Sequence, residues 1–332
     1  MLAVSLGDPA GIGPELIAAC YAAHSANGLP AFAVTGGAGV LRRAAQSRDL
    51  AIEVREVADW AEAAAVFPYA LPVIGHADAD CAFGAPDDAG ARLALGSLDA
   101  AMAAVRCGAA GGLVTAPIAK GRLARVGFEF PGQTEYCAAA CNVAFDDTVM
   151  MLAGPSLRAV PLTIHIALRD VPDRLTANLI YRRARVVAAA LRDDFGIEQP
   201  RLAVCGLNPH AGEDGRMGDE EARIIAPTIA GLQREGIDIT GPHPADTMFA
   251  PRARATYDAA LAMYHDQALV PLKALDFDEG VNVTLGLPVV RTSPDHGTAF
   301  DIAGKGVADP GAMRAAIRMA GEMVSRRAKV RP

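Results

Sequence analysis

The chain has 332 residues, which is enough for one large α/β domain or two domains of ordinary size. Hydrophobic residues make up 52% of it and charged residues 21%, which excludes a disordered or collagen-like chain. The formal net charge of −7 excludes a global positive field for nucleic acid or an anionic membrane, although a local anion site is still allowed.

The first residues contain no basic segment and soon reach Asp8, so we predict no signal peptide. No run of residues approaches the ~18 apolar residues of a membrane span. The six cysteines stand in apolar surroundings, and the pair Cys137 and Cys141 has no second pair to complete a zinc knuckle. We therefore expect reduced thiols in a cytoplasmic protein that binds neither nucleic acid nor membrane.

Short apolar runs alternate with alanine-rich helical patterns along the whole chain. The candidate strands are 2–6, 31–35, 112–115, 157–166, 201–207, 259–264 and 282–285, and the candidate helices include 13–23, 88–107, 175–195 and 220–234. This alternation predicts an α/β fold of mostly parallel sheets with helices on both faces. In such folds ligands bind at the carboxyl ends of the strands, so the residues at those ends are the candidates for function.

The first candidate strand runs into a loop of glycines and prolines, residues 7–15. Gly11 and Gly13 allow a tight turn, and Pro14 suits the first position of a helix. The amides at that helix start are typical of an anion site, but the G-x-G-x-x-G fingerprint is absent. The spacing is equally compatible with an anion-binding loop and with a purely structural turn.

Three of the seven histidines, His165, His210 and His265, stand at the ends of predicted strands. Together they suit an open three-histidine metal site that leaves positions for a substrate. Taken singly, a histidine of this kind is more often an ordinary hydrogen-bonded residue than a metal ligand, and the spacing of the three matches no local motif.

A second set of polar residues, scattered along the chain, is suited to bind anions. Lys273 and Arg291 lie among apolar residues, Asn282 lies in a strand-like run, and Gln133 and Thr134 open a helix. Donors of these types bind phosphate or carboxylate, whereas a lone Arg or Lys is more often solvated.

The last candidate is the glycine-punctuated loop 295–306. Small residues beside His296 allow close approach to a flat ring, while the alternative is a loop that caps the helix starting near Pro310.

Six segments in this order carry a family likeness: SLGDPAGIGPE (5–15), NPHAGE (208–213), GPHPADT (241–247), YHDQ (264–267), NVTLGLP (282–288) and RTSPDHG (291–297). They strongly resemble the PdxA-type family of 4-hydroxythreonine-4-phosphate dehydrogenases, and the likeness extends from about residue 3 to about residue 322. It implies a fold of the isocitrate and isopropylmalate dehydrogenase type, with two α/β/α domains and an obligate homodimer whose cleft lies at the interface. On this basis we expect a cofactor-side domain of residues 1–129 and 271–332, and a central metal and dimerisation domain of residues 130–270.

The resemblance also implies roles for individual residues. His165, His210 and His265 correspond to ligands of one divalent metal ion per subunit (zinc, cobalt or magnesium), shared across the dimer. The expected substrate-binding residues are Gln133, Thr134, Lys273, Asn282 and Arg291. The NAD or NADP site is expected at Gly11, Gly13, His296, Gly297, Thr298 and Asp301. Lys273, Asp246 and Asp266 are expected to act in catalysis, as proton carriers or as groups that orient the metal ligands.

One position departs from the family, which usually has His-Thr-Glu where this chain has Gln133, Thr134 and Glu135. Glutamine donates hydrogen bonds but carries no charge. The implied reaction is NAD(P)-linked oxidation of 4-phosphooxy-L-threonine with loss of CO₂, giving 3-amino-2-oxopropyl phosphate for pyridoxal phosphate synthesis. The alternatives are a dehydrogenase of a phosphorylated sugar acid or of a cis-dihydrodiol carboxylate, or a non-oxidising transferase or lyase on the same fold.

Overall fold

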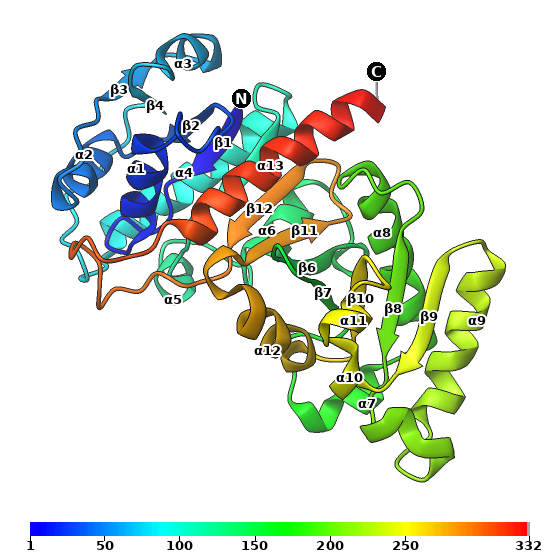
Figure 1. Ribbon diagram of the computed structural model, residues 1–332. Helices are drawn as coiled ribbons and strands as arrows, with labels where there is room; N and C mark the ends of the chain where they lie inside the picture. The colour runs from blue at the N-terminus through cyan, green and yellow to red at the C-terminus, as the bar shows by residue number, and fades with distance from the viewer. Residues whose placement is uncertain (331–332) are drawn as a thin grey trace. The chain divides into compact units, whose positions relative to one another are not determined.

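The computed structural model describes residues 1–330, which divide into two compact α/β units (Figure 1). The first unit comprises Met1–Asn142 and Leu287–Ser325, and the second comprises Val143–Gly286 and the described residues from Arg326 onward. The boundaries expected from the sequence lie earlier in the chain, after residues 129 and 270. The difference arises because residues 130–142 pack with the first unit and residues 271–286 with the second.

The sheet of the first unit is entirely parallel. Its strands, in the order β3-β4-β2-β1-β5-β12, are β3 (Val54–Val57), β4 (Leu71–Ile74), β2 (Phe32–Thr35), β1 (Leu2–Ser5), β5 (Gly112–Thr115) and β12 (Val290–Pro294). Every residue of the last four strands is buried, as expected for parallel strands with helices on both faces.

The helices of this unit are α1 (Gly13–Ala22), α2 (Ala38–Ser47), α3 (Trp60–Val66), α4 (Asp88–Arg106), α5 (Lys120–Ala124), α6 (Gln133–Ala140) and α13 (Gly311–Val330), which continues past Ser325. The long helix α4 contacts β1, β2 and β5. It begins where the carboxylate of Asp87 accepts the backbone N–H of Gly90 at 2.7 Å, which satisfies one of the amides left open at a helix start.

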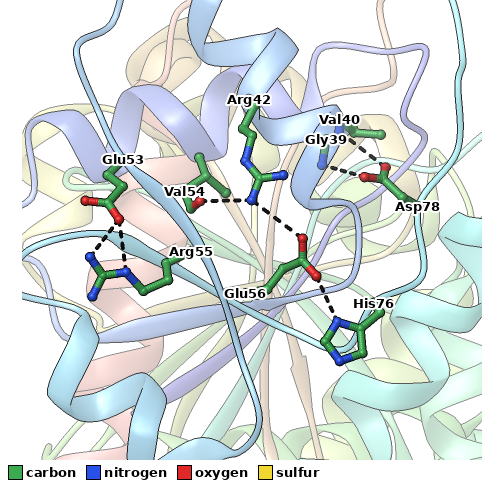
Figure 2. A network of polar contacts seen from close by, with 9 residues as sticks. All are labelled: Gly39, Val40, Arg42, Glu53, Val54, Arg55, Glu56, His76 and Asp78. Carbon is green, nitrogen blue, oxygen red and sulfur yellow. Dashed lines mark hydrogen bonds and ion pairs between the residues drawn. The ribbon is translucent and has the colours of Figure 1, made fainter.

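The start of α2 is closed by a residue from elsewhere in the same unit (Figure 2). Asp78 accepts the N–H groups of Gly39 and Val40 at 2.5 and 3.3 Å. Farther along α2, Arg42 lies 3.5 Å from Glu56 of β3, and Glu56 in turn contacts His76 at 2.8 Å. Because a carboxylate of the chain already holds these amides, the start of α2 offers them to no external anion.

The second unit contains a mixed sheet in the order β11-β6-β7-β10-β8-β9. Strand β6 runs antiparallel to both of its neighbours, and the remaining pairs are parallel. The strands are β6 (Val149–Ala153), β7 (Arg158–Pro161), β8 (Arg201–Cys205), β9 (Asp238–His243), β10 (Ala259–Ala262) and β11 (Val281–Leu285).

Helices α8 and α9 lie beside β8 and β9 of this unit, drawn in green and yellow in Figure 1. The α-helices are α7 (Val171–Arg174), α8 (Ala177–Asp193), α9 (Ala226–Arg234), α10 (Ala245–Met248), α11 (Pro251–Arg254) and α12 (His265–Asp276). The shorter turns are η1 (Phe145–Asp147), η2 (Leu168–Asp170), η3 (Pro209–Gly215), the π-turn η4 (Glu221–Ile225) and η5 (Phe277–Glu279).

The predicted α/β class is confirmed, and each predicted strand is present. Two of the predicted elements differ in the structure from their predicted form. The strand expected over 157–166 ends at Pro161, and by His165 the backbone has a φ of 54°, which an extended strand cannot contain. The helix expected over 220–234 begins as a π-turn before α9, where Pro227 provides no N–H for the helical ladder. None of the helices within residues 1–330 is both long and apolar enough to cross a bilayer.

Candidate functional site

Two of the predicted metal ligands lie together in the second unit. His165 follows β7, and His265 begins α12 directly after β10. Strands β7 and β10 are parallel neighbours, with Pro161 opposite Ala262, so their carboxyl ends reach the same edge of the sheet. The two imidazole rings have centroids 5.7 Å apart and planes inclined by 41°. Parallel pairing therefore brings together two histidines that are far apart in the sequence.

The histidine pair lines a pocket of about 250 Å³. The other lining residues are Thr163, Ile166, Leu168, Val171, Tyr264 and Asp266. Asp266 lies 2.7 Å from Nδ1 of His265, and because a carboxylate only accepts hydrogen bonds, the ring proton is placed on Nδ1. The lone pair of Nε2 is then available to a metal, as in most metal-binding histidines.

His210 lies outside this pocket, in the turn η3 after β8. Six successive residues from His210 to Gly215 have positive φ, so the turn is left-handed after Pro209. Glu213 lies 3.0 Å from Nδ1 of His210, which leaves Nε2 as the acceptor in the same way as in His265. Among residues 1–330 no three His, Cys, Asp or Glu side chains gather closely enough to hold a metal ion. The three-histidine site therefore stays a prediction, with two of its members adjacent within one chain.

In the first unit, Arg291 and Gln133 of the predicted substrate site lie together. Arg291, on β12, is only 3% exposed, and its Nη2 donates to Oγ1 of Thr115 and to Oε1 of Gln133, each at 2.7 Å. Thr115 ends β5 and donates to the same Gln133 oxygen at 2.6 Å, and Nε2 of Gln133 donates to the carbonyl of Ala116 at 3.2 Å. Burial lowers the pKa of Arg291, and the nearby Cys137 and Glu135 oppose this effect.

Thr115 was not among the predicted site residues. Its position as the last residue of a correctly predicted strand was the signal that could have identified it. Its hydroxyl accepts from Arg291 and donates to Gln133, so it completes a ring of three hydrogen bonds.

The other predicted substrate residues are distributed over both units. Thr134 is the second residue of α6 in the first unit, and Lys273 and Asn282 belong to the second. Lys273 is exposed on α12, with Nζ 6.0 Å from the centroid of the Phe277 ring. Oδ1 of Asn282, on β11, is buried and has no hydrogen-bond partner within the described part of the chain. A buried acceptor without a partner is consistent with a polar ligand at this position.

The predicted cofactor loop is held against the start of α1. The N–H of Ile12 donates to the carbonyl of Thr298 at 3.0 Å, and a Cβ on Gly11 would lie 2.7 Å from that same oxygen. The fully buried carboxylate of Glu15 accepts the N–H of Gly304. Gly11 and Gly13 therefore lie where the chain must approach other backbone closely, and their role toward a cofactor stays a prediction.

The remaining predicted residues differ in how exposed they are. Gly297 and Asp301 are exposed in the loop, as is Asp246 on α10. Nε2 of His296 is buried without a hydrogen-bond partner among residues 1–330, while Nδ1 lies 3.0 Å from the carbonyl of Gly297.

His165 and His265 thus lie beyond the carboxyl ends of parallel strands in the second unit, and in the first unit Arg291 reaches Thr115 at the carboxyl end of β5. Such strand ends are where α/β enzymes bind small molecules. Residues 29–320 match the family model described as "Pyridoxal phosphate biosynthetic protein PdxA". The chain belongs to this family.

Several proteins of known name are similar over nearly the whole length. A 4-hydroxythreonine-4-phosphate dehydrogenase of Erythrobacter litoralis is 62% identical, with 98% of this chain and 97% of the relative covered. The crystal structure of a 4-hydroxythreonine-4-phosphate dehydrogenase from Klebsiella pneumoniae matches with a TM-score of 0.86 at 39% identity, covering 98% of each chain. A terephthalate 1,2-cis-dihydrodiol dehydrogenase from Burkholderia xenovorans matches with a TM-score of 0.65 at 29% identity, covering 96% and 97%.

Proposed function

We propose that this chain oxidises 4-phosphooxy-L-threonine with NAD or NADP as the hydride acceptor. The product then loses CO₂ and gives 3-amino-2-oxopropyl phosphate for pyridoxal phosphate synthesis. The observation that carries the proposal is the 62% identity to a 4-hydroxythreonine-4-phosphate dehydrogenase over nearly all of both chains.

The histidines fit a divalent metal ion. His165 and His265 present two imidazoles at one edge of a sheet, and carboxylates hold Nδ1 of His210 and of His265. Three nitrogen ligands favour zinc or cobalt over magnesium. Held by these imidazoles, such an ion would supply Lewis-acid chemistry toward the hydroxyl of the substrate. Asp266 and Asp246 are then the residues proposed to orient the ligands or carry the proton.

The predicted substrate residues are proposed to bind the anionic groups of the substrate. Arg291 provides a guanidinium held in a fixed orientation, and Thr134 and Asn282 add uncharged polar groups. Lys273 either holds the phosphate or delivers a proton to the carbon from which CO₂ departs. Both roles require the ammonium to reach the substrate, and its exposure on α12 is compatible with each.

The loop 297–306 fits the adenosine part of a nicotinamide cofactor. Small residues at Gly297 and Thr298 allow close approach of a flat ring, and the buried Nε2 of His296 is available for a hydrogen bond at the ring edge. The loop is held in place by α1 through Ile12 and Glu15, so it needs little ordering when the cofactor binds.

We further propose a cytoplasmic homodimer in which His210 of one subunit completes the metal site of the other. Two features support it. His210 lies apart from the His165 and His265 pair, and Ile166 and Leu168 beside that pair are 40% and 66% exposed. Exposed apolar side chains beside a pocket are typical of a surface that another protein covers.

A substrate screen tests the proposal. The purified protein is supplied with zinc, cobalt or magnesium and with NAD or NADP, and the near-ultraviolet absorbance of the reduced nicotinamide is followed. We expect turnover of 4-phosphooxy-L-threonine to exceed that of phosphorylated erythronate and of a cis-dihydrodiol carboxylate. Absence of reduction with every alcohol would instead indicate a non-oxidising transferase or lyase.

The second candidate, a dehydrogenase of cis-dihydrodiol carboxylates, is favoured by one observation. The terephthalate dihydrodiol dehydrogenase structure shares the fold at 29% identity. The neutral Gln133 is also compatible with a carboxylate, which carries less charge than a phosphate. Preferential turnover of the dihydrodiol carboxylate in the same screen would assign this function.

A further inference from the structure

The side chain of Gln133, the first residue of α6, is held by hydrogen bonds to neighbouring residues. Its Oε1 accepts two hydrogen bonds, from Thr115 at 2.6 Å and from Arg291 at 2.7 Å. Its Nε2 donates to the carbonyl of Ala116 at 3.2 Å. Three of the four hydrogen-bonding positions of a glutamine amide are thus used within the first unit.

The orientation of this amide follows from its partners. A guanidinium has only donors, so the Gln133 atom facing Arg291 must be the carbonyl oxygen. Nη2 of Arg291 carries two hydrogens, and the bonds to Thr115 and Gln133 use both. Because two acceptors from different elements hold one nitrogen, the plane of the guanidinium is fixed by β5 and α6 together.

We propose that Gln133 is a positioning residue: it orients Arg291 for the anionic group of the substrate and does not itself contact the substrate. This inference rests on the proposed function in one respect, namely that Arg291 binds that anion. It replaces the direct substrate contact expected for Gln133 from the sequence.

The charge of the residue at position 133 explains why an amide suits this role. A neutral acceptor orients the guanidinium and leaves its positive charge available to the substrate, whereas a carboxylate would neutralise it. A histidine accepts a hydrogen bond only while uncharged, and it loses this ability as the pH falls through about 6.5. The amide therefore holds Arg291 independently of pH.

A double-mutant cycle tests the proposal with Gln133→Met, Arg291→Met and the double variant. We expect Gln133→Met alone to raise the KM for 4-phosphooxy-L-threonine about tenfold, the order of a hydrogen bond to a charged group. In the Arg291→Met background the same change should raise KM less than twofold, because there is no guanidinium left to orient. An equal rise in both backgrounds, or no rise in either, would overturn the proposal.

Two controls keep the cycle interpretable. Gln46→Met makes the same substitution at an exposed position of α2 and should leave KM unchanged. If Arg291→Met does not give a cooperative thermal transition, Arg291→Lys takes its place in the cycle, since lysine retains the charge without the planar fork.

A second readout is the pH dependence of Gln133→His. Relative to the unsubstituted protein, its KM should rise as the pH falls through the imidazole pKa, because the protonated ring accepts no bond from Arg291. A relative KM that instead falls with decreasing pH would show the new cation binding the anion directly, and the proposal would be wrong.

A failure of the proposed function can be distinguished from a failure of the positioning role. If the unsubstituted protein does not oxidise 4-phosphooxy-L-threonine, the substrate assignment fails. The coupling between Gln133 and Arg291 is then measured as the Kd of inorganic phosphate for the four proteins of the cycle, by calorimetry. We expect Gln133→Met to raise the Kd of phosphate when Arg291 is present and to change it little in the Arg291→Met background. An equal rise of Kd in both backgrounds would overturn the positioning role.

Discussion

The carbonyl oxygen of Gln133 lies 2.7 Å from Nη2 of Arg291, although 158 residues separate the two in the chain. The contact joins the first residue of α6 to the buried strand β12, with Thr115 of β5 as the third member. A charged side chain that is 3% exposed loses most of its contact with water, and such a group is normally held by several acceptors. The first unit therefore holds the Arg291 guanidinium in an orientation that is set before any ligand arrives.

The first prediction concerns Arg291 itself. Charge-assisted bonds to a phosphate contribute roughly 1.5–3 kcal/mol each, so Arg291→Lys should lower kcat/KM by about one to two powers of ten. The loss should largely vanish with a substrate analogue that lacks the phosphate. Steady-state kinetics with both compounds measure it, and equal losses on the two would contradict phosphate recognition by Arg291.

The second prediction concerns the metal site. Because His165 and His265 are adjacent within one chain, a dimeric site takes both from one subunit and His210 from the other. Mixing inactive His210→Ala and His265→Ala proteins should then restore about a quarter of the full activity, since half of the dimers are mixed and each has one complete site.

The matched control for this experiment is a mixture of His165→Ala and His265→Ala proteins. Every site in that mixture lacks one of the adjacent pair, so no activity should return. Recovery in this mixture would place His165 and His265 on different subunits. Sedimentation that shows an active monomer would exclude sharing altogether.

The third prediction uses two glycines. A Cβ on Gly11 would lie 2.7 Å from the Thr298 carbonyl oxygen, so Gly11→Ala should displace the loop 297–306 and raise the KM for NAD(P) about tenfold. The KM for the substrate should change little. Gly96→Ala, within α4 and with no atom within 4 Å of the added carbon, should instead stabilise the protein by about 0.5–1 kcal/mol. Equal effects of both changes on NAD(P) binding would contradict the assignment of the loop.

The fourth prediction concerns Asp8, which is 2% exposed at the end of β1. Burial raises its pKa above the ordinary 3.8, and Asp87 raises it further, although a hydrogen bond from the N–H of Ala10 opposes the shift. The folded protein thus keeps this carboxyl protonated to a higher pH than the unfolded chain does. Its contribution to stability is complete below 3.8 and is lost as the pH rises through the raised pKa.

Asp8→Asn removes this titration while retaining an acceptor for Ala10. The free energy of unfolding of the variant minus that of the unsubstituted protein should therefore increase with pH and then level off. Urea unfolding between about pH 4 and pH 8 measures the difference. Asp80→Asn, at a fully exposed side chain, controls for the change in net charge. A pH-independent difference would show that Asp8 is not shifted.

The sequence patterns predicted seven of the twelve strands in the described residues; the missed strands include the fully buried β6 and β12 as well as the partly exposed β3 and β9. Strands such as β5 and β8 were found because each contains a short, mostly apolar run, which is typical of a buried strand. Strand β12 was not predicted because Arg291, Thr292 and Ser293 interrupt its apolar character, although all three are buried. Their burial depends on hydrogen bonds to distant residues, and no local pattern encodes those bonds.

The site was predictable to the extent that it follows from strand ends. His165 and His265 were expected to meet, and parallel pairing of β7 and β10 places them together. The direction of the Gln133 amide was not predictable, because it depends on a guanidinium that reaches it across the fold. The roles of the site residues toward metal, cofactor and substrate stay predictions.

The first unit is assembled from two separated stretches of chain, and this has a consequence for synthesis on the ribosome. Strand β12 pairs with β5, yet it begins about 175 residues after β5 ends. At ordinary elongation rates this distance corresponds to roughly ten to thirty-five seconds. During that interval one edge of β5 is unpaired and the carboxylate of Glu15 lacks its partner Gly304, so we expect the nascent first unit to expose a strand edge that favours aggregation until β12 has been made.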